Sequence, residues 1–176
     1  VAMEVSPDGM IPYISRVDSG TIALVESSGI EVISSGDLVQ WCQSRWSDEA
    51  YKNHLTAVKH LYEVKDETLA FIANAISTDA QITEYGVQQM MTERFEELDL
   101  IYNHPPIVAV GAHAGDPHYT PDSLDSVQIR RDDLILIDMW AKTRDSGAVY
   151  GDITWMAYSG EKVTDRYAEI FAVIAQ

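Results

Sequence analysis

The stretch LIDMWAKTRDSGAVYGD, residues 136–152, begins as an apolar strand that carries one aspartate and ends, after a turn, at a second aspartate. Side chains alternate on either side of the turn-forming run TRDSG, a pattern typical of a β-hairpin. We therefore expect DLILIDMWA and GAVYGDITWMAY to be the two arms of an antiparallel hairpin, with Asp138 on one arm and Asp152 on the other.

The length of the turn decides where the two aspartates lie relative to each other. If residues 144–146 form the loop and Gly147 takes the left-handed conformation, Asp138 and Asp152 are directly opposed, with Cβ atoms roughly 4.5–5.5 Å apart. A different loop or a bulge would shift this register by one. In the expected register both carboxylates share a face with five large side chains: Leu134, Leu136, Trp140, Tyr150 and Met156.

Two facing carboxylates on an apolar face repel each other and lose hydration, so the fold keeps them only with some compensation. One compensation is a proton shared between them, as in acid catalysts with paired carboxylates. Another is a bridging divalent cation, for which carboxylate oxygens are suitable ligands. The third possibility is that this face is open to water and both acids are solvated. The spacing alone leaves all three open.

Composition restricts the class of protein. With 176 residues and 46% apolar content, the chain can form one ordinary domain, or one domain and a piece of a second. Its net charge of -16 repels phosphate backbones and anionic lipid, so we expect no nucleic-acid partner. The single cysteine, Cys42, cannot form an internal disulfide, and we expect it to be buried. No apolar run long enough to span a membrane is present, so a cytoplasmic location is expected.

The first forty residues predict a small βαβ fragment. A strand around residues 1–5 is followed by a helix near residues 17–27, a glycine stop at Gly29 and the short strand IEVIS. Such a fragment is too small to bury both faces of its own sheet, so something else must cover it.

The rest of the chain predicts helices followed by strands. Apolar residues recur at helical spacing from residue 47 to Ile76, with a bend near Asp66, and Thr83 opens a second helix whose Met91 is expected to pack in the core. After NHPP the period becomes that of strands, and the run VTDRYAEIFAVIAQ predicts a final helix. This order indicates an α+β fold with helices packed on one face of a sheet.

Three ordered motifs give the sequence a family resemblance. HPPIVAVGAHAGDPHY, then LIDMWAK, then YGDITW resemble the pita-bread metallopeptidases of the M24 clan, which include aminopeptidase P, prolidase, methionine aminopeptidase and creatinase. The resemblance runs continuously over roughly residues 47–160. It implies that residues 46–176 form the first half of a pita-bread catalytic domain. It also implies that residues 1–45 are the end, with a linker, of the smaller creatinase-type amino-terminal domain.

The resemblance also implies roles for individual residues. Asp138 matches the aspartate that chelates one of two metal ions, manganese, cobalt or zinc in this family, and Asp152 matches the aspartate that bridges both. His118, in PHY, matches the histidine that orients or protonates the substrate. From their positions in the sequence, His113 is expected to line the same cleft or to cap the turn, and His104 to face the substrate entrance or to lie on the surface. The family's remaining ligands, a histidine and two glutamates, belong to the second half of the domain and are absent from this chain.

We therefore expect the amino-terminal portion of an Xaa-Pro aminopeptidase or dipeptidase, acting on peptides with proline at the second position, that is inactive or nearly so by itself. Its free sheet edge is expected to favour a homodimer or association with the missing half. Two alternatives stay open. A creatinase-like hydrolase would use the same fold without metal, and a non-catalytic pita-bread module would bind peptides or proteins.

Overall fold

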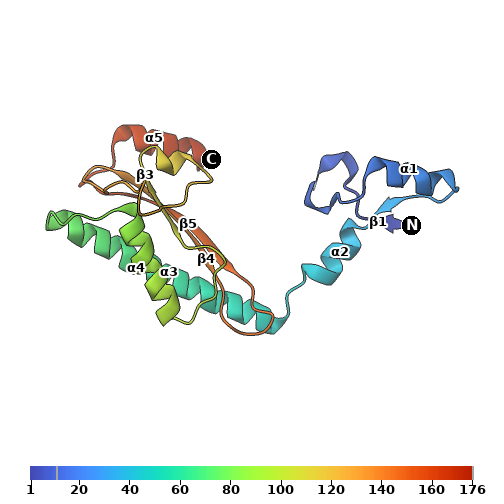
Figure 1. Cartoon of the computed structure of the whole chain (residues 1–176), viewed down its shortest axis with the longest axis horizontal. Coiled ribbons are helices and arrows are strands. Elements are labelled where there is room, and N and C mark those ends of the chain that lie inside the picture. Colours follow the sequence, from blue (N-terminus) through green and yellow to red (C-terminus); the bar gives the residue numbers. More distant parts are fainter. Residues whose placement is uncertain (11, 176) are drawn as a thin grey trace. The chain divides into compact units, whose positions relative to one another are not determined.

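The computed structural model describes residues 1–10 and 12–175 of the chain. These residues form two compact units, Val1–Ser47 and Asp48–Gln176. Each unit is built from its own elements (Figure 1).

The first unit is the predicted βαβ fragment followed by a helix that the sequence pattern did not predict. Its strands pair in parallel, with Ala2 beside Ile33, as a βαβ unit requires. Asp18 caps the first helix by accepting a hydrogen bond from the Thr21 N–H at 3.0 Å. In chain order the elements are β1 (Ala2–Met3), η1 (Pro7–Gly9), η2 (Pro12–Ile14), α1 (Ser19–Ser27), β2 (Ile33–Ser34) and α2 (Gly36–Gln43).

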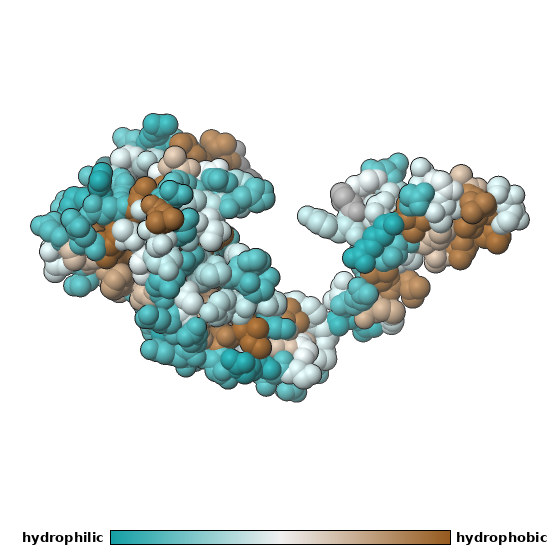
Figure 2. Space-filling model, in the orientation of Figure 1, coloured by the Kyte–Doolittle hydropathy of each residue, from teal (hydrophilic) through white to brown (hydrophobic). Residues whose placement is uncertain are grey.

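This unit has almost no core of its own. No apolar side chain is buried among its described residues, and Leu24, Leu38 and Trp41 are 72%, 59% and 67% exposed. Figure 2 shows the resulting hydrophobic surface over α1 and α2. Cys42 is also exposed, so the expectation that it is buried is wrong. The cause is the unit's size, because a fragment this small cannot cover α2.

The second unit contains the predicted helices and strands. Its elements are α3 (Asp48–Ser77), α4 (Glu84–Glu97), β3 (Ile107–Val110), η3 (His113–Gly115), β4 (Leu134–Ala141), β5 (Gly151–Tyr158) and α5 (Asp165–Ile174). The long helix α3 runs without interruption through Asp66, where a bend was expected. It contains neither proline nor glycine, the residues that most often kink a helix.

The sheet of this unit is antiparallel, in the order β3-β4-β5, and α3 and α4 pack against one of its faces. Alternate residues of β4 are buried, among them Ile135, Ile137 and Met139, and these join one core cluster with the α3 and α4 side chains. Met91 of α4 is fully buried, as predicted. The other face of β4, which carries Asp138, is only half-buried.

Gly151 brings β5 against α3 directly before Asp152. A Cβ atom on Gly151 would lie 3.0 Å from Cγ2 of Val58 and 3.1 Å from Cδ1 of Leu61. Only glycine allows this approach without displacing the helix. The glycine of the YGD motif therefore fixes the strand that carries the second aspartate.

Candidate active site

The hairpin closes in a different register from the one expected. Asp138 pairs with Thr154, and Asp152 pairs with Trp140, so the prediction that the two aspartates are directly opposed is wrong. The ladder ends at Ala141 and Gly151, because the connection is longer than the assumed loop. Gly147 does take the left-handed conformation, at φ 75°.

The shift is by two residues, so it keeps both carboxylates on one face. Side chains alternate along a strand, and a shift of two restores the same side. Asp138 and Asp152 are thus diagonal neighbours across the hairpin. Such diagonal pairs are typically separated by roughly 7–8 Å. They share the face of the sheet opposite α3 and α4.

Asp138 is half-buried and partly oriented by its neighbour. The Thr154 hydroxyl donates a hydrogen bond to its Oδ1 atom at 2.7 Å. Since a carboxylate has about four acceptor positions, this single bond leaves most of its capacity for other partners.

Asp152 is electrostatically affected by Asp138 despite the diagonal arrangement. Partial desolvation raises the pKa of the Asp152 carboxyl above its ordinary value, and the charge of Asp138 raises it further. Both effects disfavour the ionised form, and a cation beside the pair would oppose both.

A cavity of about 280 Å³ opens beside Asp138. It lies between the β4–β5 hairpin and the loop that follows β3, and its walls are mainly apolar. The lining residues are Ile107, Ala109, His113, Ala114, Gly115, Asp116, Pro117, Leu136, Asp138 and Thr154.

The structure brings together only some of the predicted site residues. His113 lines this cavity together with Asp138. His118 is exposed on the same loop, and its side chain is outside the lining, although its backbone N–H donates to Oδ1 of the lining residue Asp116 at 2.9 Å. His104 is exposed, with its ring centroid 6.2 Å from that of Trp140. Trp140 is in turn the strand partner of Asp152.

One buried acid near the cavity was missed as a site residue. Glu84, the first residue of α4, is 0% exposed. Its carboxylate pairs with Nδ1 of His113 at 3.0 Å and accepts a hydrogen bond from the Tyr119 hydroxyl at 2.6 Å. In the sequence, Glu84 directly follows the N-cap Thr83, a position where an acid stabilises the helix dipole. This local reason gives no sign of the contacts that Glu84 makes with His113 and Tyr119.

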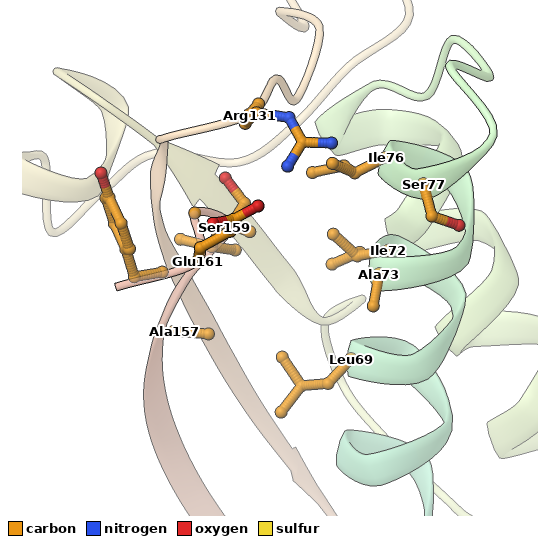
Figure 3. A pocket seen from close by; sticks show the side chains of 12 residues that line it. Leu69, Ile72, Ala73, Ile76, Ser77, Arg131, Ala157, Ser159 and Glu161 are labelled. Carbon is orange, nitrogen blue, oxygen red and sulfur yellow. The ribbon is translucent and has the colours of Figure 1, made fainter. Parts of the chain in front are cut away.

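A larger cavity of about 410 Å³ lies on the helix side of the sheet, between α3 and the end of β5 (Figure 3). Leu69, Ile72 and Ile76 form an apolar wall, and Arg131 reaches from the opposite side toward Ile76. The Asp138–Asp152 pair lies on the opposite face of the sheet. This cavity is therefore separate from the candidate site.

The described residues do not hold a complete metal site. No group of three or more histidine, cysteine, aspartate or glutamate side chains is arranged to hold a metal ion within residues 1–10 and 12–175. The two aspartates supply hard oxygen donors of the kind that divalent cations take, but fewer than such an ion needs.

The comparison with protein families identifies the group. The model of metallopeptidase family M24 matches residues 52–176. The chain belongs to this family. No protein of curated function matches the sequence.

Solved structures agree with the M24 assignment at the level of the fold. A dipeptidase from Pyrococcus horikoshii OT3 superimposes with a TM-score of 0.62 at 21% identity, over 90% of this chain and 41% of its own. The X-Pro aminopeptidase from Thermotoga maritima MSB8 superimposes with a TM-score of 0.60 at 18% identity, over 91% of this chain and 43% of its own. A cytosolic X-prolyl aminopeptidase from Caenorhabditis elegans is described as having a di-nuclear active site. It superimposes with a TM-score of 0.63 at 20% identity, over 78% of this chain and 22% of its own.

These similarities confirm the predicted fold class. The α+β fold of this M24 chain is part of the pita-bread fold, and the chain spans less than half the length of the structures it matches. No helix of the described residues is both long enough and apolar enough to cross a membrane.

Proposed function

We propose that this M24 chain supplies part of the active site of an Xaa-Pro aminopeptidase or dipeptidase. Asp138 and Asp152 would hold two divalent ions, manganese, cobalt or zinc. The observation that supports this most directly is the pair itself, two carboxylates on one open sheet face whose charges affect each other. Divalent ions, when bound, lower the pKa of a coordinated water enough for it to act as a nucleophile near neutral pH.

The chain's own residues would bind and orient the peptide. Thr154 holds one carboxylate oxygen of Asp138, which restricts the directions from which a ligand can approach. The apolar cavity beside Asp138 suits a proline ring at the second position of a peptide. His113 would contact that peptide, His118 would stabilise or protonate the reacting amide, and His104 would face the substrate entrance.

The incomplete donor set leads to the second part of the proposal. In the part of the chain that the structure describes, two carboxylates without a ligating imidazole give few coordination positions, so the chain alone is expected to bind a transition metal weakly and to hydrolyse peptides very slowly. A histidine and two glutamates from a second half of the domain would complete the site, and one glutamate would be the general base. Residues 1–45 would end a smaller amino-terminal domain, and the protein would work in the cytoplasm.

Manganese binding tests the roles of the aspartates. We expect the chain to bind Mn²⁺ weakly, as measured by electron paramagnetic resonance, and Asp138→Asn or Asp152→Asn to lower the affinity by about tenfold or more. The matched control is Asp145→Asn, at the exposed tip of the same hairpin, which should leave the affinity unchanged. Equal affinity in all four proteins would contradict the proposed metal site.

A peptidase assay tests the need for further ligands. The purified chain with Mn²⁺ should cleave Xaa-Pro dipeptides and tripeptides at no more than a trace rate. Brisk turnover that disappears on chelation would mean that the absent ligands are unnecessary or come from a second copy of the chain. Turnover that persists without metal, checked by elemental analysis, would favour the creatinase-like alternative instead.

A further inference from the structure

The carboxylate of Glu84 is fully buried and is surrounded by hydrogen-bond donors. Its Oε1 atom accepts from the Val110 N–H at 2.8 Å, and its Oε2 atom accepts from the Val127 N–H at 3.0 Å and the Tyr119 hydroxyl at 2.6 Å. Nδ1 of His113 lies 3.1 Å and 3.0 Å from the two oxygens. Four groups from residues 110–127, the last residue of β3 and the loop that follows it, therefore meet at one side chain.

These contacts determine the tautomer of His113. Backbone N–H groups can only donate, so both oxygens of the Glu84 carboxylate are acceptors, one toward Val110 and one toward Val127. Since both oxygens already accept, the short contact to His113 requires a proton on Nδ1. In the neutral ring Nε2 is then the acceptor.

The orientation of the His113 ring is fixed as well. The ring stacks on Tyr119 with centroids 4.1 Å apart and planes inclined by 25°. The ring is only partly exposed, and it lines the cavity that Asp138 also lines. Within the described residues Nε2 makes no hydrogen bond, which makes it the ring nitrogen able to meet a ligand in this cavity.

We propose that Glu84 is a positioning residue that locks His113 in the Nδ1–H tautomer and so presents Nε2 as a hydrogen-bond acceptor to a peptide N–H or α-amino group in the cavity. The peptide part of this inference rests on the proposed function. The tautomer does not, because it follows from the contacts of Glu84 alone. Glu84 acts through His113 and does not itself line the cavity.

Nitrogen-15 NMR of the histidine rings in the whole chain, at about pH 8.5 where neutral imidazole predominates, measures the tautomer directly. In the wild type we expect His113 to be mainly in the Nδ1–H form. In Glu84→Gln an amide N–H can face Nδ1, so the ratio of Nδ1–H to Nε2–H should fall about tenfold or more. Tyr119→Phe, which keeps the Glu84–His113 pair, should preserve the wild-type tautomer.

A matched control comes from a similar pair on α3. Nδ1 of His60 lies 2.9 Å from Oε2 of the part-exposed Glu63, away from the cavity. Glu63→Gln should change the His60 signals and leave those of His113 unchanged. An Nε2–H tautomer of His113 in the wild type would overturn the proposal even if Glu84→Gln does not fold, and so would an unchanged ratio in a folded Glu84→Gln.

Titration with the dipeptide Ala-Pro separates this proposal from the proposed function. We expect the dipeptide to shift the His113 Nε2 signal in the wild type and to shift it less in Glu84→Gln. Equal shifts in both proteins would overturn the positioning role. If the dipeptide shifts no signal while the tautomer is as expected, peptide binding by this chain is contradicted and the Glu84–His113 assignment stands.

Discussion

Glu84 and Asp138 lie near the same cavity, but their carboxylates differ in burial and in hydrogen bonding. This difference makes Glu84 a supporting residue and Asp138 a candidate metal ligand. Glu84 is fully buried and meets four donors, so its oxygens have no capacity left. Asp138 is half-buried and, among the residues that the structure describes, accepts one hydrogen bond, from Thr154. A buried charge is tolerated when all its hydrogen bonds are made, whereas a carboxylate with open positions can take an external cation.

Sequence reasoning found the second kind of carboxylate more easily than the first. Asp138 lies in an apolar strand, where a charge needs an explanation, and this drew attention to it. Glu84 lies at the start of a helix, where an acid is common for local reasons. Its four partners come from positions 26 to 43 residues away, and such contacts become visible only in the folded chain.

The hydroxyl of Tyr119 gives a prediction about stability and pH. Burial raises the pKa of Tyr119 above its ordinary value of 10.0, and its hydrogen bond to Glu84 raises it further. A raised pKa means that the native state prefers the neutral phenol, so this stabilisation is complete below about pH 10 and declines as pH rises above it. Tyr119→Phe should lower the unfolding free energy by about 1–2 kcal/mol at pH 8, and by less at higher pH.

Urea unfolding at pH values below and above about pH 10 measures the stabilisation by the Tyr119 hydroxyl. Tyr85→Phe is the matched control, since its hydroxyl makes no hydrogen bond within residues 1–10 and 12–175, and it should change the free energy of unfolding little at any pH. An identical loss of stability with rising pH in the wild type and in Tyr119→Phe would mean that Tyr119 is not responsible for it.

At the scale of elements, the local sequence pattern determined the arms and the turn of the hairpin but not its register. Alternation in β4 and the glycine of the turn correctly placed the two arms and the left-handed Gly147. The register was missed because it depends on where the ladder stops, here at Gly151, and that glycine packs against Val58 of α3. The helix α2 was missed as well, since it has only eight residues, a length at which a helix and a strand are hard to tell apart from sequence.

Gly147 provides a test of the hairpin as an element. Its φ of +75° is unfavourable for a residue with a Cβ atom, but a Cβ there would meet no atom within 4 Å. Gly147→Ala should therefore cost only the backbone term, about 1–2 kcal/mol of unfolding free energy. The control is Gly115→Ala, which has equal space and no positive φ, and it should cost much less in urea unfolding. Equal costs would show that the left-handed turn is unimportant for stability.

At the scale of the whole molecule, the fold class followed from the order of helices and strands, but the exposed surfaces could be located only in three dimensions. The sheet has β3 and β5 at its edges within the described residues, and its face opposite α3 and α4 carries Met156, which is 41% exposed. Apolar side chains on an open face beside a free strand edge favour association with another chain. The net charge of -16 opposes association between identical copies.

These opposing terms predict weak, concentration-dependent self-association that increases with salt. Light scattering over a concentration series at low and high ionic strength measures it, because screening weakens the repulsion and leaves apolar contacts intact. Met156→Lys places a charge on the open sheet face and should raise the concentration needed for association by about tenfold. Val163→Lys makes the same change in charge at a side chain that is 47% exposed but lies outside the sheet, so it should have little effect.

If the wild type stays a monomer at high concentration and high salt, the open face does not bind a second copy. If both variants weaken association equally, the contact does not run through the sheet.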